Sequence, residues 1–349
     1  MQFNPKKQRL VCPYCGAEAD APASAPEAAV VEHDLLSALH ALPKSQGYGQ
    51  AVIHIHCESC GATSTYSDKV QATRCPFCDS PKVRPLSDGA PVIAPESVLP
   101  FAVTKADAGK RVVDWLGSGW FRPNDLKSLT EKLKFQGAYL PFWTFDAQTA
   151  SDWRADAGYY YYESEYYEAQ ENGQTVQRER QVQRTRWEPA WGHVDLGFDD
   201  VLVLASRGVS AAHMTKVEPF DTHALKPYSA EYLAGYLAER YAVDLAAGWD
   251  RGRSLIDRAI ADACTRAIPG DTYRGLSVQS RYDGLTYKHT LLPVWLGAYR
   301  YRDKAYQCVV NGQTGKVAGD VPLSVVKIAF AIAFALIALA LFVWLSSQK

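Results

Sequence analysis

Apolar and polar residues are mixed along most of this chain, but one long stretch near its end is wholly apolar. Eighteen consecutive apolar residues, IAFAIAFALIALALFVWL, run from Ile328 to Leu345. A helix of that length measures about 27 Å, close to the hydrocarbon thickness of a bilayer. A helix that is apolar on every face has no polar side to present to water. We therefore expect a transmembrane helix over residues 325–345; the alternative is a helix buried in a large soluble core.

Apolar residues recur at helical spacing in four earlier stretches, Val30–Leu42, Thr104–Leu116, Ser229–Tyr241 and Gly252–Ala267. Aromatic strand runs begin at Leu140-Pro-Phe-Trp143 and at Leu292-Pro-Val-Trp295. The order strand, helix, strand meander therefore occurs twice. This pattern predicts an α+β, sheet-rich body over residues 91–322, with an internal repeat of 98–206 and 217–320. The proline-rich residues 81–100 would link the body to what precedes it.

Three dipeptides favour two-residue hairpin turns: Asn172-Gly173, Asp283-Gly284 and Asn311-Gly312. If Asn172-Gly173 is a hairpin tip, the numbers of facing residues sum to 345. Arg180 then faces Glu165, and the other arginines of that strand, Arg178, Arg184 and Arg186, face Tyr167, Tyr161 and Tyr159. An arginine stripe resembles a nucleic-acid-binding surface, but arginines opposed by acids and rings favour a self-neutralised sheet face.

Six of the eight cysteines lie in CxxC pairs before residue 79. Cys57 and Cys60 are separated from Cys75 and Cys78 by fourteen residues, which is typical of a zinc ribbon. Four thiolates close a tetrahedron around Zn²⁺ and leave no position for a catalytic water. We therefore expect one structural zinc ion, held in a ribbon over residues 52–84 of an N-terminal module of residues 1–90.

A further pair, Cys12 and Cys15, forms a knuckle for which no other CxxC remains. We favour an incomplete ribbon here, without metal or with weakly bound metal. The alternative is a second zinc site that a histidine or another chain completes.

Charge and targeting signals predict the compartment and the orientation of the chain in the membrane. The N-terminus has basic residues but no apolar run behind them, so we expect no signal peptide. Lys316 and Lys327 precede the apolar run, which favours a single-pass protein of the cytoplasmic (inner) membrane with its N-terminal domain in the cytoplasm. The net charge is −1, and residues 1–90 hold eight Lys/Arg and nine Asp/Glu, so attraction to phosphate should be weak.

Motifs of common enzymes are missing from the sequence. It contains no GxxxxGK[ST], GxSxG or HExxH, and no GxGxxG after a strand. We therefore assign no catalytic and no cofactor-binding residue, and expect the protein not to be an enzyme. A hydrolase with an unrecognised site is the least favoured interpretation.

Several stretches resemble a family of bacterial membrane-anchored zinc-ribbon proteins. They are CPYCG (Cys12–Gly16), the ribbon Cys57–Cys78, LPFAVTK (Leu99–Lys105), QGAYLPFWTFDA (Gln136–Ala147), LPVW (Leu292–Trp295) and VNGQTGKVAGD (Val310–Asp320). Such proteins are described as TFIIB-type zinc-ribbon proteins, or as primosomal protein N′ (replication factor Y) superfamily II helicases, although helicase motor motifs are missing here.

The resemblance implies a double ribbon followed by this body. It matches Cys57, Cys60, Cys75 and Cys78 to the second ribbon, and Cys12 and Cys15 to half of the first. It further implies a membrane platform that recruits SPFH-domain (flotillin-like) or PspA-type envelope-stress proteins.

Two functions of different classes remain. The favoured one is a non-enzymatic, membrane-tethered zinc-ribbon adaptor that recruits protein partners. The alternative is a zinc-dependent nucleic-acid-binding accessory protein of replication, because zinc ribbons often contact DNA or RNA.

Overall fold

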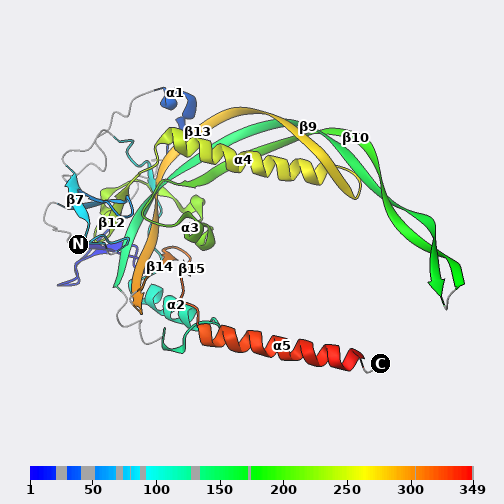
Figure 1. The fold of residues 1–349 in the computed structure, drawn as a ribbon. Helices are drawn as coiled ribbons and strands as arrows, with labels where there is room; N and C mark the ends of the chain where they lie inside the picture. Colours follow the sequence, from blue (N-terminus) through cyan, green and yellow to red (C-terminus); the bar gives the residue numbers. More distant parts are fainter. Residues whose placement is uncertain are drawn as a thin grey trace.

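The structure, a computed structural model, describes the chain apart from residues 21–29, 41–51, 68–73, 79, 87–91, 127–133, 172–173, 303 and 348–349. It is an α+β, sheet-rich protein with an apolar C-terminal helix (Figure 1). The strands are β1 (Gln2–Asn4), β2 (Arg9–Val11), β3 (Glu18–Asp20), β4 (His33–Asp34), β5 (Val52–Cys57), β6 (Thr63–Ser67), β7 (Val83–Leu86), β8 (Ser97–Val98), β9 (Lys134–Glu171), β10 (Gln174–Leu204), β11 (Lys226–Pro227), β12 (Leu237–Arg240), β13 (Thr272–Tyr301), β14 (Lys304–Asn311) and β15 (Val317–Gly319). The α-helices are α1 (Leu35–Leu39), α2 (Lys105–Gly117), α3 (Ala211–Val217), α4 (Leu245–Ala267) and α5 (Val325–Ser347), with short 3-10 turns at Thr222–Ala224 and Ala230–Leu233.

Two long antiparallel strands, β9 and β13, form the centre of the main sheet. The sheet continues as β11-β8-β13-β9-β12-β6-β5-β7, and β8 and β12 run parallel to β13 and β9 respectively. Both β8 and β12 are followed by a helix and then by a long strand, α2 with β9 and α4 with β13. Strands β5, β6 and β7, which flank the cysteine turns, thus belong to the same sheet as the body, because β6 pairs with β12 and with β5, and β5 pairs with β7.

The core of the body lies where helices cover the long strands. Trp143 and Phe145 of β9 are fully buried beneath α4. The helix approaches so closely that a Cβ at Gly248 would lie 2.5 Å from the Trp143 ring. Glycine at this position therefore permits the contact between helix and sheet.

Beyond Gly158, strand β9 loses its partner β13 and pairs only with β10. We call this two-stranded segment, residues 159–171 and 174–186, the arm. Figure 1 shows it curving away from the body. Its register agrees with the prediction: Arg180 faces Glu165 and Arg184 faces Tyr161. The expected turn at residues 172–173 lies outside the described residues.

Helix α5 projects from the body and is exposed along its length. It is the one helix within the described part of the chain that is long and apolar enough to cross a membrane. None of its most apolar window is buried, so the alternative of a helix inside a soluble core is wrong. At its base, the backbone N–H of Ser324 donates to the carbonyl oxygen of Phe121 at 2.7 Å. The Lys327 ammonium donates to the Arg122 carbonyl oxygen and to Asn124 Oδ1, at 2.8 and 2.6 Å.

The helix predicted over Ser229–Tyr241 is wrong. The segment contains a 3-10 turn, then Gly235 at φ +89°, then strand β12. Pairing with β9 on one edge and with β6 on the other outweighs the local helical pattern. Of the helix predicted over Val30–Leu42, residues 41–42 lie outside the described part of the chain. Within residues 30–40 the helix is limited to α1, which Asp34 caps by accepting from the Ser37 N–H.

Two predicted hairpin turns also differ. Asp283-Gly284 is not a chain reversal, because β13 runs through it with a bulge between Asp283 and Thr286 and with Gly284 at φ +60°. After β14 the chain does reverse, but Asn311 pairs with Lys316, so the loop holds four residues. The proline-rich stretch 81–100, expected as a linker, contains β7 and β8. The helices expected at Thr104–Leu116 and Gly252–Ala267 are confirmed, the second extending back to Leu245.

Candidate metal centre

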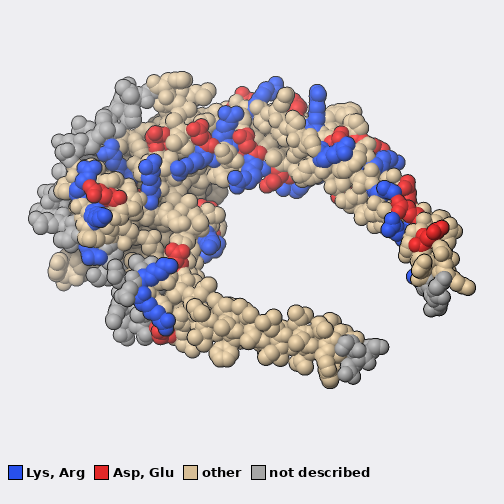
Figure 2. Space-filling model, viewed as in Figure 1, with Lys and Arg blue, Asp and Glu red and all other residues tan. Residues whose placement is uncertain are grey.

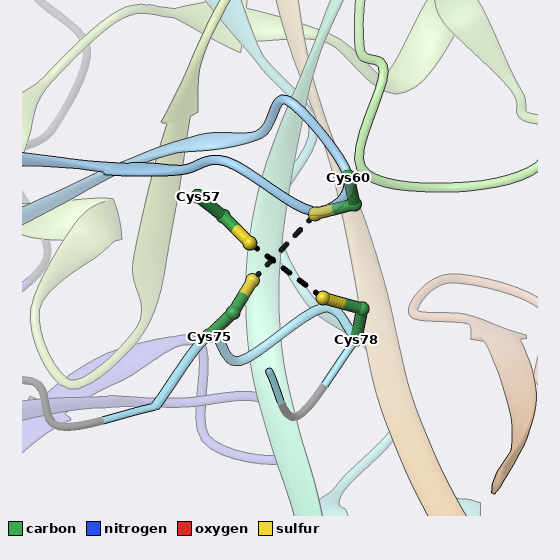
Figure 3. A group of neighbouring side chains, drawn as sticks. All are labelled: Cys57, Cys60, Cys75 and Cys78. Atoms are coloured by element: carbon green, nitrogen blue, oxygen red, sulfur yellow. Dashed lines mark hydrogen bonds between the residues drawn. The ribbon is translucent and has the colours of Figure 1, made fainter. Parts of the chain in front are cut away.

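Four cysteine thiols, those of Cys57, Cys60, Cys75 and Cys78, converge on one point (Figure 3). All four sulfurs lie within 4.8 Å of one another. The Cys57 and Cys78 sulfurs are 3.6 Å apart, and the Cys60 and Cys75 sulfurs 3.7 Å apart. A tetrahedron with metal–sulfur bonds of about 2.3 Å has edges of about 3.8 Å. The predicted ligands are therefore brought together, and the cluster could hold a metal ion with little rearrangement.

Tight backbone turns aim the thiols. Cys57 donates its N–H to the Ala62 carbonyl oxygen at 2.9 Å, and Gly61 donates back to the Cys57 carbonyl oxygen at 2.9 Å. Gly61 has φ +76°, a conformation that glycine adopts readily, so the glycine closes the turn. The second knuckle begins in the same way, with the Cys75 N–H donating to the Ser80 carbonyl oxygen at 2.8 Å.

The cluster is closed to water on one side. Cys57 and Cys75 are 1% and 3% exposed, while Cys60 and Cys78 are partly buried. Phe77, within the second knuckle, packs into the same apolar cluster as Leu140 of β9 and Leu292 of β13. Four protein ligands with no position for water are the arrangement of a structural site.

The thiols share protons when no metal replaces them. The hydrogen bond from Cys60 lowers the pKa of the Cys75 thiol and raises the pKa of the Cys60 thiol. Burial raises the pKa of Cys78 to about 11. A bound divalent ion would displace these protons, so its affinity would rise with pH.

Sequence reasoning missed a buried carboxyl behind the cluster. Glu239 of β12 is fully buried, and burial raises its pKa to about 8. Its neighbours include Ser206, Gly208 and, electrostatically, Cys75. No local signal marks this residue, because it reaches the cysteines only through the pairing of β12 with β6.

A second acidic group, Asp146, Asp199 and Asp200, gathers at the bulge between β9 and β10. Lys288 occupies it, with its ammonium 2.7 Å from Asp200 Oδ1 and 3.0 Å from Glu32 Oε1. This group is therefore a partly buried ion-pair network.

The predicted pair Cys12 and Cys15 lies in the turn between β2 and β3, apart from the four-cysteine cluster. Within the described residues, no third Cys, His, Asp or Glu joins these two thiols in a metal-ligand group.

Comparisons with known proteins add little about activity. No protein-family model matches the chain. A Bacillus subtilis (strain 168) protein with the name "Uncharacterized protein YdjG" is 28% identical over 242 residues, which cover 68% of this chain and 66% of that protein. The chain thus spans slightly less than two thirds of the length of this relative. No solved structure matches.

Proposed function

We propose that this protein is a non-enzymatic adaptor, tethered by α5 to the cytoplasmic membrane, which recruits protein partners from the cytoplasmic side. The observation that carries the proposal is the arm. A two-stranded ribbon without a third strand or a covering helix is marginally stable alone. An arm of this length gives the chain a large surface for contact with other proteins.

The arm has the composition of a protein-binding surface. Five of its tyrosines are at least 41% exposed: Tyr160, Tyr161, Tyr162, Tyr166 and Tyr167. Tyrosine supplies a large, rigid contact area with a polar end and is enriched at protein interfaces. Acidic and basic side chains intermingle along it, whereas the described part of α5 after Lys327 carries neither (Figure 2). An interspersed charge pattern favours specific protein contacts over attraction to a polyanion.

Zinc is the metal that we propose for the four-cysteine cluster. Soft thiolates in a tetrahedral arrangement select Zn²⁺ or iron–sulfur chemistry, and two CxxC knuckles on short strands favour zinc. A zinc ion in the cluster would hold the ribbon of residues 52–84 against β12 and so stabilise the body sheet.

The loop beside the base of α5 supports the membrane assignment. Trp120 and Phe121 are 72% and 45% exposed and stack with their ring centroids 6.3 Å apart. Exposed aromatic residues beside the start of an apolar helix suit the membrane–water interface. We propose that this loop rests in the interface next to Lys327.

We further propose that the two units described above, β8-α2-β9 and β12-α4-β13, are an internal repeat. The pairing of the strands supports this repeat, because the short strand of each unit runs parallel to the long strand of the other: β8 pairs with β13, and β12 pairs with β9. The resemblance to membrane-anchored zinc-ribbon proteins directs the partner search to SPFH-domain and PspA-type proteins.

Shortening the arm tests the adaptor function. Because Tyr159 faces Arg186, replacing residues 160–185 by Asn-Gly should close a two-residue hairpin in the native register. We expect the shortened chain to keep its membrane attachment and its zinc. A photo-reactive residue at position 162 or 166 of the full chain identifies the proteins that contact the arm, and the shortened chain should no longer bind these proteins. A photo-reactive residue at Leu255, 42% exposed on α4, is the control. Unchanged partners in the shortened chain would refute the proposal.

A further inference from the structure

The turn at Cys12 has the same backbone geometry as the metal-binding turn at Cys57. Cys12 donates its N–H to the Ala17 carbonyl oxygen at 2.8 Å, and Gly16 donates back to the Cys12 carbonyl oxygen at 3.0 Å. Gly16 has φ +71°, against +76° at Gly61. Both bonds and the left-handed glycine therefore repeat the first knuckle of the four-cysteine cluster.

The sulfur of Cys12 is also held as a ligand sulfur is held. It accepts backbone hydrogen bonds from Cys15 and Tyr14, three and two residues later, which lower its pKa. In the four-cysteine cluster, Cys75 accepts from Cys78 and Phe77, at the same two positions. The turn thus presents two thiols in the arrangement of half a zinc site.

This half-site is attached to the body and faces solvent. Strand β1 fixes it to the body, because Phe3 is 3% exposed and its N–H donates to the Ala234 carbonyl oxygen at 3.0 Å. Phe3 also packs against Tyr232 with ring centroids 5.3 Å apart. At the tip, Tyr14 is 97% exposed and Cys15 is exposed, whereas the buried ligands Cys57 and Cys75 are covered.

The described residues of the chain offer no completing pair. All eight cysteines and all eight histidines of the sequence lie within the described residues, and none joins Cys12 and Cys15. The other cysteines are committed to the four-cysteine cluster or, as Cys264 and Cys308, buried in the core.

A second copy of the chain would complete the site with the same two residues. A two-fold axis through the metal makes such an interface self-complementary. Charges around the knuckle do not oppose it, because Lys7 pairs with Glu18 and Arg9 with Asp20, the latter at 3.2 Å. We propose that Cys12 and Cys15 of two copies bind one shared zinc ion and that this site joins the protein into a dimer.

Zinc content and mass test the proposal together. The full-length chain, purified in detergent under reducing conditions with zinc and then freed of excess metal, should hold about one and a half zinc ions per chain and contain two chains per particle. The Cys12→Ser/Cys15→Ser variant should hold about one zinc ion per chain and contain one chain per particle. Retention of the other zinc shows that the variant is folded.

The matched control is Tyr14→Ser, which changes the exposed tip of the same turn and keeps both thiols; it should behave as the unaltered chain. Light scattering after gel filtration gives the protein mass, and mass spectrometry gives the metal. One zinc ion per chain in the unaltered protein would overturn the proposal, as would two zinc ions in a single-chain particle. A dimer that survives in the double-serine variant would overturn it as well.

Discussion

Arg180 and Glu165 face each other across the arm, with 2.8 Å between the guanidinium Nη2 and the carboxylate Oε2. Arg184 binds the other oxygen of the same carboxylate. These hydrogen bonds and charges, that of Arg180 first, hold the pKa of Glu165 below its usual range. Arg186 is also satisfied, since it binds Glu188 at 3.0 Å and lies over the Tyr159 ring, and Arg178 has an interaction partner too. The arginines that resemble a nucleic-acid surface therefore already have partners.

This pairing predicts weak binding to nucleic acid. We expect the full-length protein in detergent to bind DNA or RNA no more tightly than the nonspecific range of about 10⁻⁴ to 10⁻⁶ M at physiological salt. Equilibrium titration with labelled single- and double-stranded oligonucleotides measures this. Submicromolar binding that disappears in Arg178→Glu/Arg180→Glu would favour the nucleic-acid accessory function over the adaptor.

Replacing Cys75 by Ser should remove one zinc ion per chain and lower the thermal unfolding temperature. Structural zinc contributes on the order of 10 kcal/mol to the folding of zinc-finger peptides. Because β6 pairs with β12, we expect the loss to destabilise the body sheet as well as the ribbon. Cys264→Ala, at a fully buried cysteine outside the cluster, is the control and should keep its zinc. Metal content near zero in the unaltered protein under reducing conditions would contradict the assignment.

Truncation before Val325 should release the protein from membranes. Eighteen apolar residues give effectively irreversible insertion, unlike a single lipid chain. The full chain should float with membranes in a density gradient after carbonate extraction, whereas the truncated chain should stay at the bottom. Full-length protein that washes off in carbonate would show that α5 does not span the bilayer.

A photo-reactive residue at Trp120 should form adducts with lipid, because its loop lies at the base of α5. The same residue at Trp344 within α5 should do so too, while one at Trp191 of β10, 74% exposed and so as accessible as Trp120, should not. Mass spectrometry of the adducts distinguishes the outcomes. Lipid adducts at position 344 but not at position 120 would support the assignment of α5 as the anchor and contradict the placement of the loop in the interface. An absence of adducts at position 344 would contradict the anchor assignment itself.

His289 should make the fold sensitive to acid. Burial lowers the pKa of this histidine to about 4, from an ordinary value of about 6.5. The folded state keeps the ring neutral while the unfolded state binds a proton, so this contribution is fully present above about pH 6.5 and is lost as the pH falls toward 4. The protonation of His289 changes the free energy of unfolding by at most about 3 kcal/mol.

Unfolding temperatures of His289→Gln between pH 4 and pH 7 check this. The variant should be less stable at every pH, because it loses the packing of the His289 ring against the Trp143 ring, whose centroids are 5.0 Å apart. Its stability should nevertheless fall less steeply as the pH is lowered. The control is His223→Gln, at an exposed position. Parallel pH profiles for His289→Gln and the unaltered protein would contradict the assignment.

Features that depend on neighbours in the sequence could be predicted from it. The spacing of Cys57, Cys60, Cys75 and Cys78 could be predicted to bring four thiols together, because each knuckle is a local turn. Short strands flank the turns: β6 follows the first knuckle, and β7, which follows the second, pairs with β5. The register of the arm could be predicted from the Asn172-Gly173 dipeptide, because a two-residue turn assumed at that position fixes which residues face each other. The apolar run predicted a helix within α5, and the tertiary structure then showed that this helix is exposed.

Other features depended on partners distant in the sequence, and only the tertiary structure decided them. Residues 229–241 carry a helical pattern, yet two free sheet edges, those of β9 and β6, drew 237–240 into a strand. Asp283-Gly284 became a bulge because β9 continues alongside it and leaves no room for a reversal. Glu239 reached the cysteine cluster through the same β12 pairing. In each case backbone hydrogen bonds to a distant strand contributed more than the local preference, and no sequence pattern encodes which edge will be near.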